Sequence, residues 1–376
     1  MTGPLTGFKV VELAGIGPGP FCAMMLADMG AEVICVDRKT PGALGGGGSI
    51  VDRGRRTIIL DLKNPASVEI VLRLVKRSDV LIEGMRPGVM ERLGLGPEPC
   101  LQRNPRLVYG RMTGWGQTGP LAQAAGHDLN YIAITGALNA MGHADRAPTP
   151  PLHLVGDMGG GAMMLAFGIV SALLETSRSG QGQVVDAAIC DGVSLLATMY
   201  YAMLKSGIWS TRREANMLDG GAHFYSCYAC ADGKFVSIGA IEPQFYALLL
   251  QRCGIDDSDF KAQWVQKEWP ALRRKLEALF KTRTRDQWCE LLECSDACFA
   301  PVLDFAEAAQ HPHNVARGTF IETNGVTHPV PAPRFSRTPG AAGTVPKVGQ
   351  HTLEILSELG FSEIEIMTLR ESNVIL

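Results

Sequence analysis

The chain has 376 residues, 46% of them hydrophobic and 19% charged, so it can bury a large core and is too long for one ordinary domain. That balance excludes global disorder, and a formal net charge of −3 excludes a strongly basic nucleic-acid binder. The ten cysteines are scattered, mostly in apolar segments, which is typical of core packing in a reducing compartment and not of a disulfide framework.

The first part of the chain alternates between short apolar strands and helices. The sequence predicts strands at 10–13, 33–36, 57–62 and 80–82, and helices at 21–30 and 68–76. Such an alternation indicates a parallel sheet with helices on both faces. Residues 15–20 are predicted as a turn, and the glycine run at 45–48 as a flexible loop.

The first strand-to-helix turn imitates a dinucleotide-binding fingerprint. Gly15 and Gly17 follow the strand, and Asp37 comes about twenty residues later. The third glycine position, however, is Pro20, and Pro18 removes an N–H that could meet a phosphate. We therefore expect a Rossmann-like turn there. A dehydrogenase stays a minor alternative. An absorbance scan for a bound nicotinamide or flavin would distinguish it from the other interpretations.

Several cations fall on the turns and strand ends of this region. Positive side chains at strand ends suit a ligand that carries several phosphates, of which coenzyme A is one. A solvated basic surface would give the same pattern, so charge alone leaves both interpretations open. The residues are Arg38, Arg53, Arg55, Arg56, Lys63, Arg86 and Arg92.

Two polar residues stand at predicted helix starts in the middle of the chain. His127 lies among small residues before an apolar helix that Asp128 can cap, and Asp157 precedes a predicted buried helix at 159–174. The helix start would favour the ionised form of Asp157, and the glycines at 159–161 would let a ligand approach the backbone. A structural histidine and an ordinary cap remain the plain alternatives.

The region after residue 222 has a different pattern. Strands are predicted at 224–230 and 234–240, joined by the hairpin signal Asp232-Gly233. Helices at 243–252 and 285–293 then indicate a smaller α+β domain over 223–325. Glu242 stands directly before Pro243, a typical first helical residue, and could cap that helix or orient a histidine ring.

The sequence carries no sign of a membrane or secretory role. The longest uncharged apolar stretch, 159–174, is shorter than a bilayer span needs, so no membrane span is expected. The N-terminus has no basic region followed by an apolar run. We expect a cytoplasmic protein.

A series of motifs resembles the class III CoA-transferase family over nearly the whole chain. Two of the motifs, those at 126–131 and 239–246, resemble the racemase branch of that family in particular. The motifs are Val-Val-Glu-Leu-Ala-Gly-Ile-Gly-Pro-Gly-Pro at 10–20, Val-Asp-Arg at 36–38, Asp-Leu-Lys at 61–63, Arg-Pro-Gly-Val at 86–89, Arg-Met-Thr-Gly-Trp-Gly-Gln-Thr-Gly-Pro at 111–120, Gly-His-Asp-Leu-Asn-Tyr at 126–131, Gly-Gln-Val-Val-Asp-Ala-Ala at 182–188, Ala-Asn-Met-Leu-Asp-Gly-Gly-Ala at 215–222 and Gly-Ala-Ile-Glu-Pro-Gln-Phe-Tyr at 239–246.

This resemblance implies a fold and an assembly. The expected architecture is α/β: a large Rossmann-like CoA-binding domain with a parallel sheet at 1–187, completed by 330–376, a linker at 188–222, and the small α+β domain at 223–325. Two such chains would interlock as a homodimer. The resemblance implies no metal or redox cofactor, because CoA is part of the acyl-CoA substrate.

The resemblance also implies a reaction, the inversion of the carbon next to the thioester in 2-methylacyl-CoA. His127 and Asp157 would be the two acid/base residues, with Glu242 paired to His127. The backbone N–H of Asp128 would stabilise an enolate between the two bases. Other positions match the family's CoA path, namely Arg38, Leu60, Leu62, Lys63, Arg86, Arg92, Gly126, Asp128 and Tyr131.

Two positions depart from the family pattern. His153 replaces an asparagine four residues before Asp157, and a cation there would hold Asp157 ionised. His223 replaces a proline, which could change the interdomain linker or the acyl pocket.

Two alternatives share the fold. In a class III CoA-transferase, Asp157 would act as a nucleophile and form an acyl anhydride. His127 and Glu242 argue against it, because a transferase needs no second base on the opposite face. A non-catalytic CoA-binding protein would bind acyl-CoA without exchanging its α-proton.

Overall fold

The computed structural model describes residues 2–38 and 49–375, so the predicted glycine loop at 45–48 lies outside the described residues. The chain forms two compact units, each with its own hydrophobic core. Unit 1 comprises Met1–Thr135, Pro151–Ala197 and Phe320–Leu376, and unit 2 comprises Gly136–Pro150 and Thr198–Thr319.

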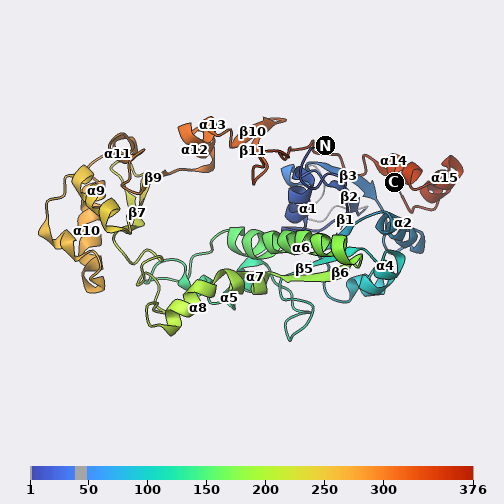
Figure 1. Cartoon of the computed structure of the whole chain (residues 1–376), viewed down its shortest axis with the longest axis horizontal. Helices are drawn as coiled ribbons and strands as arrows, with labels where there is room; N and C mark the ends of the chain where they lie inside the picture. The colour runs from blue at the N-terminus through green and yellow to red at the C-terminus, as the bar shows by residue number, and fades with distance from the viewer. Residues whose placement is uncertain (1, 39–48, 376) are drawn as a thin grey trace. The chain divides into compact units, whose positions relative to one another are not determined.

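A six-stranded parallel sheet organises unit 1 in the order β3-β2-β1-β4-β5-β6 (Figure 1). The predicted parallel sheet is therefore confirmed. The strand order reverses between β1 and β4, and open α/β sheets bind ligands beyond the carboxyl ends of the strands at such a point. The strands are β1 (Lys9–Leu13), β2 (Glu32–Asp37), β3 (Arg55–Ile59), β4 (Val80–Glu83), β5 (Val108–Thr113) and β6 (Gln183–Ala188).

Helices pack on this sheet through their apolar faces. In α2, which begins at Pro65 after the cap Asn64, the buried residues Ile70, Val71 and Leu74 recur at helical spacing. The helices of unit 1 are α1 (Pro18–Asp28), α2 (Pro65–Lys76), α3 (Val89–Arg92), α4 (Pro97–Arg103), α5 (Asp128–Ala133), α6 (Met163–Ser179), α7 (Ile189–Leu196), α14 (Thr352–Glu358) and α15 (Glu363–Glu371), with the 3₁₀ turn η1 (Ile50–Asp52), the π-helix η3 (Leu154–Ala162) and the hairpin β10 (Phe320–Thr323) and β11 (Val326–Pro329).

The first helix begins earlier than predicted. α1 starts at Pro18 and includes Pro20, both of which were expected in a turn. Proline fits the first turn of a helix because the N–H that it lacks would have no partner there. Gly17 precedes the helix with φ +66°, which a glycine adopts without strain.

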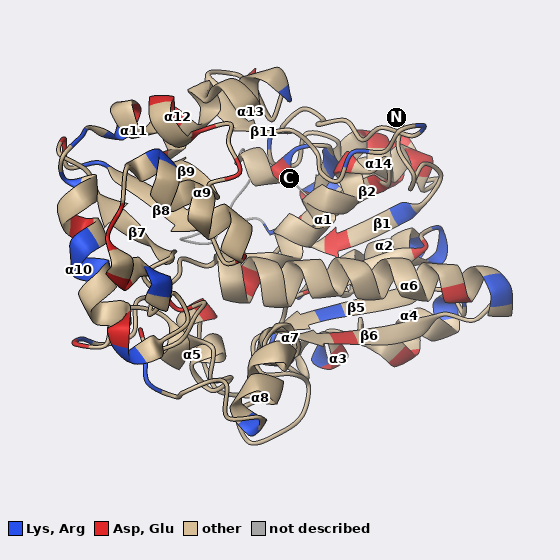
Figure 2. Ribbon diagram, turned by 60° about the vertical axis from the view of Figure 1, so that its left-hand side comes forward, with Lys and Arg blue, Asp and Glu red and all other residues tan. Residues whose placement is uncertain are grey.

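The apolar helix in the middle of the chain is also longer than predicted. The π-helix η3 continues into α6, so one helical segment spans Leu154–Ser179 and ends at Gly180. This segment of 26 residues is long and apolar enough, by length and composition only, to cross a membrane, and 44% of its most apolar 18-residue window is buried. Figure 2 shows it without charges along its middle.

The prediction that this helix is buried is correct for one face only. Leu165, Ile169 and Leu173 are buried, and the helix packs against β5 and β6. The opposite face exposes an apolar stripe formed by Met163, Phe167, Val170 and Leu174.

Unit 2 contains an antiparallel sheet in the order β7-β8-β9, covered by helices. The predicted hairpin is confirmed, with Gly233 at φ +76° in the turn. The strands are β7 (Tyr225–Ala229), β8 (Phe235–Gly239) and β9 (Phe299–Val302). The helices are α8 (Thr198–Lys205), α9 (Pro243–Cys253), α10 (Trp269–Phe280), α11 (Arg285–Leu292), α12 (Phe305–Gln310) and α13 (Pro312–Ala316), with 3₁₀ turns η2 (Leu138–Ala140), η4 (Ser258–Ala262) and η5 (Gln266–Glu268).

His223 belongs to the core of unit 2. Its side chain is fully buried among aromatic rings, and Nε2 lies 2.7 Å from the Tyr246 hydroxyl oxygen. Burial and the nearby Arg273 lower the pKa of His223 to about 4. The structure places the His223 ring inside this core, and its effect on the linker or on an acyl pocket stays a prediction.

Candidate active site

A pocket of about 680 Å³ opens at the carboxyl ends of β1, β4 and β5. It lies where the strand order reverses, the expected ligand position in such a sheet. The turn after β1, the loop after β4, the end of β5 and the starts of α5 and η3 line it. Among the predicted site residues, His127, Asp157, Arg86, Gly126 and Tyr131 line this one pocket.

His127 occupies the N-cap position of α5, with an extended backbone. Its backbone N–H donates to Asn130 Oδ1 at 3.1 Å, which fixes the entry into the helix. The hydroxyl of Tyr131 donates to the Gly126 carbonyl oxygen, and its ring packs edge-to-face on Trp115 at 4.8 Å between ring centroids. These contacts hold the start of α5 at the pocket.

Asp157 lies inside the π-helix η3, whereas the sequence predicted that it precedes a helix. Its backbone N–H donates to Asp128 Oδ1 at 2.6 Å. The carboxylate rests against the turn after β1, where a Cβ on Gly17 would lie 3.0 Å from Asp157 Oδ2. Asp128 is the first residue of α5 and therefore does not cap that helix; its carboxylate binds the backbone of Asp157 instead.

The surroundings of Asp157 favour its protonated form. Burial, followed by the charge of Asp128, raises its pKa from 3.8 to about 6, while His153 and His127 act in the opposite direction. The prediction that the surroundings of Asp157 favour its ionised form is wrong, because burial and the charge of Asp128 raise its pKa. The direction predicted for His153 is confirmed, and His153 also lines the pocket.

The glycines behind Asp157 serve helix packing. A Cβ on Gly160 would lie 2.9 Å from the backbone nitrogen of Val193 in α7, and one on Gly161 would lie 3.1 Å from Pro18 Cβ in α1. Both glycines are buried. The expectation that they admit a ligand to the backbone is therefore wrong for these two positions.

The residues predicted along a CoA path have different surroundings. Arg86 lines the pocket, and the guanidinium of Arg38 contacts Sδ of Met85, another lining residue, at 3.4 Å. Arg92 lies next to Gly88, where a Cβ would be 3.3 Å from its Nη1.

Three further predicted positions follow β3 and do not belong to the lining of the pocket. Leu60 has its side chain in the core of unit 1, Leu62 packs against that core, and Lys63 is exposed.

Three cations that were proposed as possible phosphate ligands are engaged elsewhere. Arg53 is buried and paired with Asp28, with 2.6 Å between Nη2 and Oδ2. Arg55 is buried beside Glu12 and Asp52, and Arg56 pairs with Glu32, Glu354 and Glu358. The interpretation of these three as ligand cations is wrong, because ion pairs within unit 1 occupy them.

Glu242 lies in unit 2, at the N-cap position of α9, and its side chain makes no capping hydrogen bond. Its position before the helix is as predicted, whereas the capping interaction is not formed. The pairing of Glu242 with His127 stays a prediction.

Sequence reasoning missed parts of the pocket wall. Trp115 lines the pocket, and its buried indole N–H has no hydrogen-bond partner among the described residues. Beneath the wall, Arg111 Nε donates to Glu83 Oε1 at 2.9 Å, and Glu83 Oε2 accepts the Met85 N–H at 2.7 Å. The run of small residues around Trp115 was the available signal, since glycines flank it on both sides.

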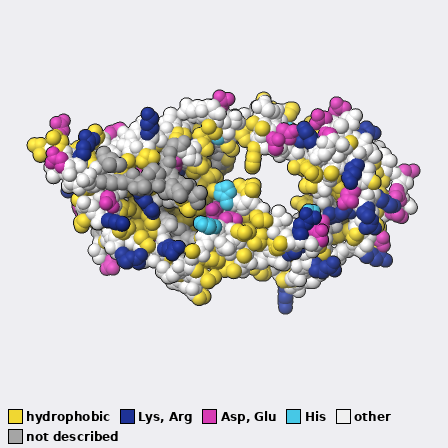
Figure 3. All heavy atoms as spheres, turned by 180° about the vertical axis from the view of Figure 1, so that it is seen from behind, with side chains coloured by type: hydrophobic (Ala, Val, Ile, Leu, Met, Phe, Trp, Pro, Cys, Tyr) yellow, Lys and Arg dark blue, Asp and Glu magenta, His cyan; other side chains and the backbone are white. Residues whose placement is uncertain are grey.

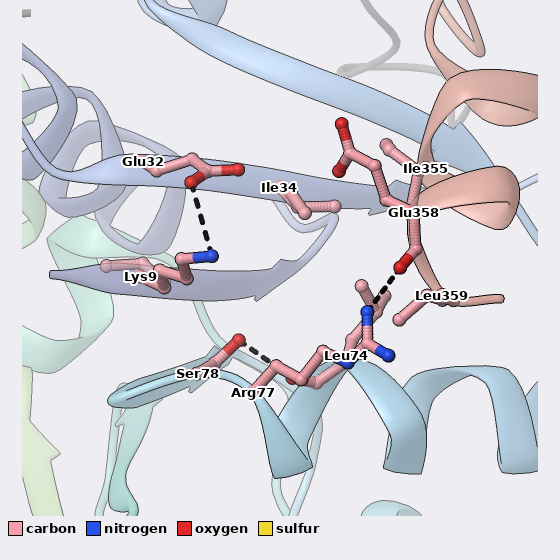
Figure 4. Close-up of a pocket in the computed structure, with 10 residues that line it drawn as sticks. Lys9, Glu32, Ile34, Leu74, Arg77, Ser78, Ile355, Glu358 and Leu359 are labelled. Carbon is pink, nitrogen blue, oxygen red and sulfur yellow. Dashed lines mark hydrogen bonds and ion pairs between the residues drawn. The ribbon is translucent and has the colours of Figure 1, made fainter. Parts of the chain in front are cut away.

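A second pocket of unit 1, of about 300 Å³, lies where β1 and β2 begin (Figure 4). Its cations already have partners: Lys9 pairs with Glu32 at 3.8 Å, and Arg77 donates to the main-chain carbonyl oxygen of Glu358. This pairing makes it a poorer ligand site than the larger pocket.

Histidine and acidic side chains adjoin one another on the face shown in Figure 3, with hydrophobic side chains around them. Over residues 2–38 and 49–375, no group of three or more His, Cys, Asp or Glu side chains could hold a metal ion. The larger pocket offers the imidazoles of His127 and His153 and the carboxyl of Asp157 for proton transfer.

Comparisons with known proteins agree with this fold. A family model described as CoA-transferase family III matches residues 5–352. The chain is 46% identical to an α-methylacyl-CoA racemase of Mus musculus over 376 residues, and 45% identical to that of Homo sapiens over 375 residues, covering 99% of this chain and 97% of each relative. It also superposes on the crystal structure of a CaiB/BaiF family protein from Brucella suis with a TM-score of 0.80 and 29% identity, over 96% of this chain and 100% of the other.

Proposed function

The chain belongs to CoA-transferase family III, and we propose that within this family it is a racemase, an isomerase that inverts the carbon next to the thioester of 2-methylacyl-CoA. The observation that carries the proposal is that His127 and Asp157 line the same pocket. The 45–46% identity to racemases over 99% of the chain supports it.

The proposed reaction is a proton transfer between two bases. One of His127 and Asp157 removes the α-proton, and the electron pair of that C–H bond moves onto the thioester oxygen to give an enolate. The other residue then delivers a proton to the opposite face of the planar carbon, and the roles exchange in the reverse direction. A carboxyl with a pKa of about 6 suits this exchange, because it can take up and release a proton near neutral pH.

The enolate oxygen needs a hydrogen-bond donor. We assign this role to the backbone N–H of Asp128, which is in the first turn of α5 and therefore has no acceptor within the helix. Arg86, with Arg38 and Arg92 nearby, would hold the phosphates of CoA, since exposed guanidinium groups pair well with phosphate. CoA is part of the substrate, and the proposed reaction uses no metal or redox cofactor.

Exchange of the α-proton tests the function. The purified protein is incubated with (R)-2-methylacyl-CoA in D₂O, deuterium at C2 is measured by mass spectrometry, and the epimers are separated on a chiral column. Deuterium at C2 together with the S epimer is the expected result. If the acyl group instead passes to an added free acid without exchange at C2, Asp157 is a nucleophile and the chain is a CoA-transferase.

We also propose that the protein is a homodimer. The apolar stripe of α6 supports this, because Phe167 is 73% exposed and such a contiguous apolar face is typical of an interaction surface. Light scattering after size-exclusion chromatography should give twice the chain mass for the wild type and a lower mass for Phe167→Glu. A wild type that elutes at the mass of one chain would contradict the proposal.

A further inference from the structure

Asp128 links the two residues that carry the proposed chemistry. It follows His127 directly in the chain, and its carboxylate accepts the backbone N–H of Asp157 at 2.6 Å. One side chain therefore connects the start of α5, which bears His127, to the π-helix that bears Asp157.

The packing around this link is close. A Cβ on Gly156 would collide with the Asp128 carboxylate and would lie 2.9 Å from Ile132 Cγ2, so only glycine lets α5 and η3 approach at this point. On its other side, the Asp157 carboxylate rests against Gly17. Asp157 is thus held through its backbone by Asp128 and through its side chain by the turn after β1.

The same contact brings two carboxylates together in a partly buried site. The groups whose charges act on Asp157 are Asp128, His127 and His153, and Tyr131 and Arg86 line the same pocket. Asp128 is the negative member of this set, so its charge opposes the ionisation of Asp157.

We propose that Asp128 is a positioning residue, whose carboxylate fixes the backbone of Asp157 relative to His127 and places a second negative group beside the Asp157 side chain. This role belongs to its side chain and is separate from that of its backbone N–H. It rests on the proposed function only for its effect on turnover. Its effect on the titration of Asp157 is independent of any substrate.

Two substitutions separate the two parts of the role. Asp128→Asn keeps an oxygen acceptor for the Asp157 N–H and removes the charge, whereas Asp128→Ala removes both. We expect Asp128→Ala to lose at least about tenfold more in kcat than Asp128→Asn at pH 8, because small displacements of a catalytic group are costly.

The titration of Asp157 is measured by NMR on protein labelled with [¹³C]aspartate, with the resonance assigned from its loss in Asp157→Asn. We expect the pKa of Asp157 to fall toward its ordinary value in Asp128→Asn and to stay unchanged in Glu98→Gln, which removes an exposed negative charge elsewhere in unit 1. An unchanged Asp157 titration in folded Asp128→Asn would overturn the charge role. Equal kcat for Asp128→Ala and wild type would overturn the positioning role. If neither the wild type nor the Asp128 variants exchange α-protons, the racemase proposal fails while the titration result still stands.

Discussion

At the scale of single residues, the pocket depends on how Asp157 is surrounded. Desolvation and Asp128 raise its pKa, and His153 and His127 lower it, with a net value of about 6. A group balanced in this way is sensitive to each neighbour, so single substitutions should have separable effects on turnover and on pH dependence.

Removing either base should leave an enzyme that exchanges the α-proton of only one epimer. We expect His127→Ala and Asp157→Ala each to lower racemisation by roughly 10²–10⁴-fold, the usual size of a lost acid/base group. Each variant keeps one base, so each should still exchange the α-proton of one epimer in D₂O, and the two variants should act on opposite epimers. Exchange of both epimers by the same variant would show that the lost residue is not one of the two bases.

The histidine that departs from the family pattern should shift the pH profile. His153 lowers the pKa of Asp157, so His153→Asn should raise that pKa and move the acid limb of kcat/KM to higher pH in the direction where Asp157 is the base. His313→Asn, which removes an exposed histidine of unit 2, is the matched control and should leave the profile in place. Identical acid limbs for His153→Asn and wild type would contradict the prediction.

At the scale of elements, the π-helix explains how a carboxylate enters the pocket from within the first turn of a helical segment. Its path is set by close packing, since Gly160 meets α7 and Gly161 meets α1. π-helical turns are rare and often occur at functional sites. Here Asp157 lies one turn inside the segment, so its carboxylate reaches the pocket without being a cap.

Adding one methyl group at this crossing should destabilise the fold. In Gly160→Ala the Cβ would be 3.0 Å from the carbonyl oxygen of Ile189, and we expect a loss of about 1–3 kcal/mol in the free energy of unfolding. Gly19→Ala is the control, because nothing lies within 4 Å of its Cβ and alanine favours a helix. Urea unfolding of both variants checks this, and equal stability would show that η3 and α7 can move apart.

The sequence predicts elements well where local pattern decides them. The apolar strands of the sheet and the Asp232-Gly233 hairpin follow from periodicity and turn chemistry, and both are present. The π-helix could not be predicted, because Gly160 packs against residues about thirty positions later. The ion pairs of Arg53 and Arg55 were missed for the same reason: Asp28 and Glu12 are distant in sequence. The identity of His127 and Asp157 came from the family resemblance, since composition and spacing alone could not bring them together.

At the scale of the whole molecule, the two units bury titratable groups of opposite kinds. Unit 1 buries Asp37 and Asp157, whose pKa values are raised to about 6, chiefly by desolvation. Unit 2 buries His223, whose pKa is lowered to about 4. In each case the fold favours the neutral form of the group. Lowering the pH increases the neutral form of a carboxyl and decreases the neutral form of a histidine.

The stabilities of the two units should therefore change in opposite directions between pH 5 and pH 6.5. In unit 1 the folded chain binds protons more tightly than the unfolded chain, so the stability from Asp37 and Asp157 is present at low pH and is lost as the pH rises through about 6. In unit 2 the unfolded chain binds the proton of His223 more tightly, so stability is lost as the pH falls from 6.5 toward 4, by about 1–2 kcal/mol between pH 6.5 and pH 5.

Hydrogen exchange, corrected for the pH dependence of the intrinsic rate, measures the two units separately through β5 in unit 1 and β8 in unit 2. Protection of β5 should fall and protection of β8 should rise as the pH increases from 5 to 6.5. Asp157→Asn should reduce the change in unit 1, to which Asp37 also contributes, and leave unit 2 as it is. His223→Gln should remove the change in unit 2 and leave unit 1 as it is. If one variant changes the pH dependence of protection equally in both units, the units unfold together, and the prediction of opposite trends is wrong.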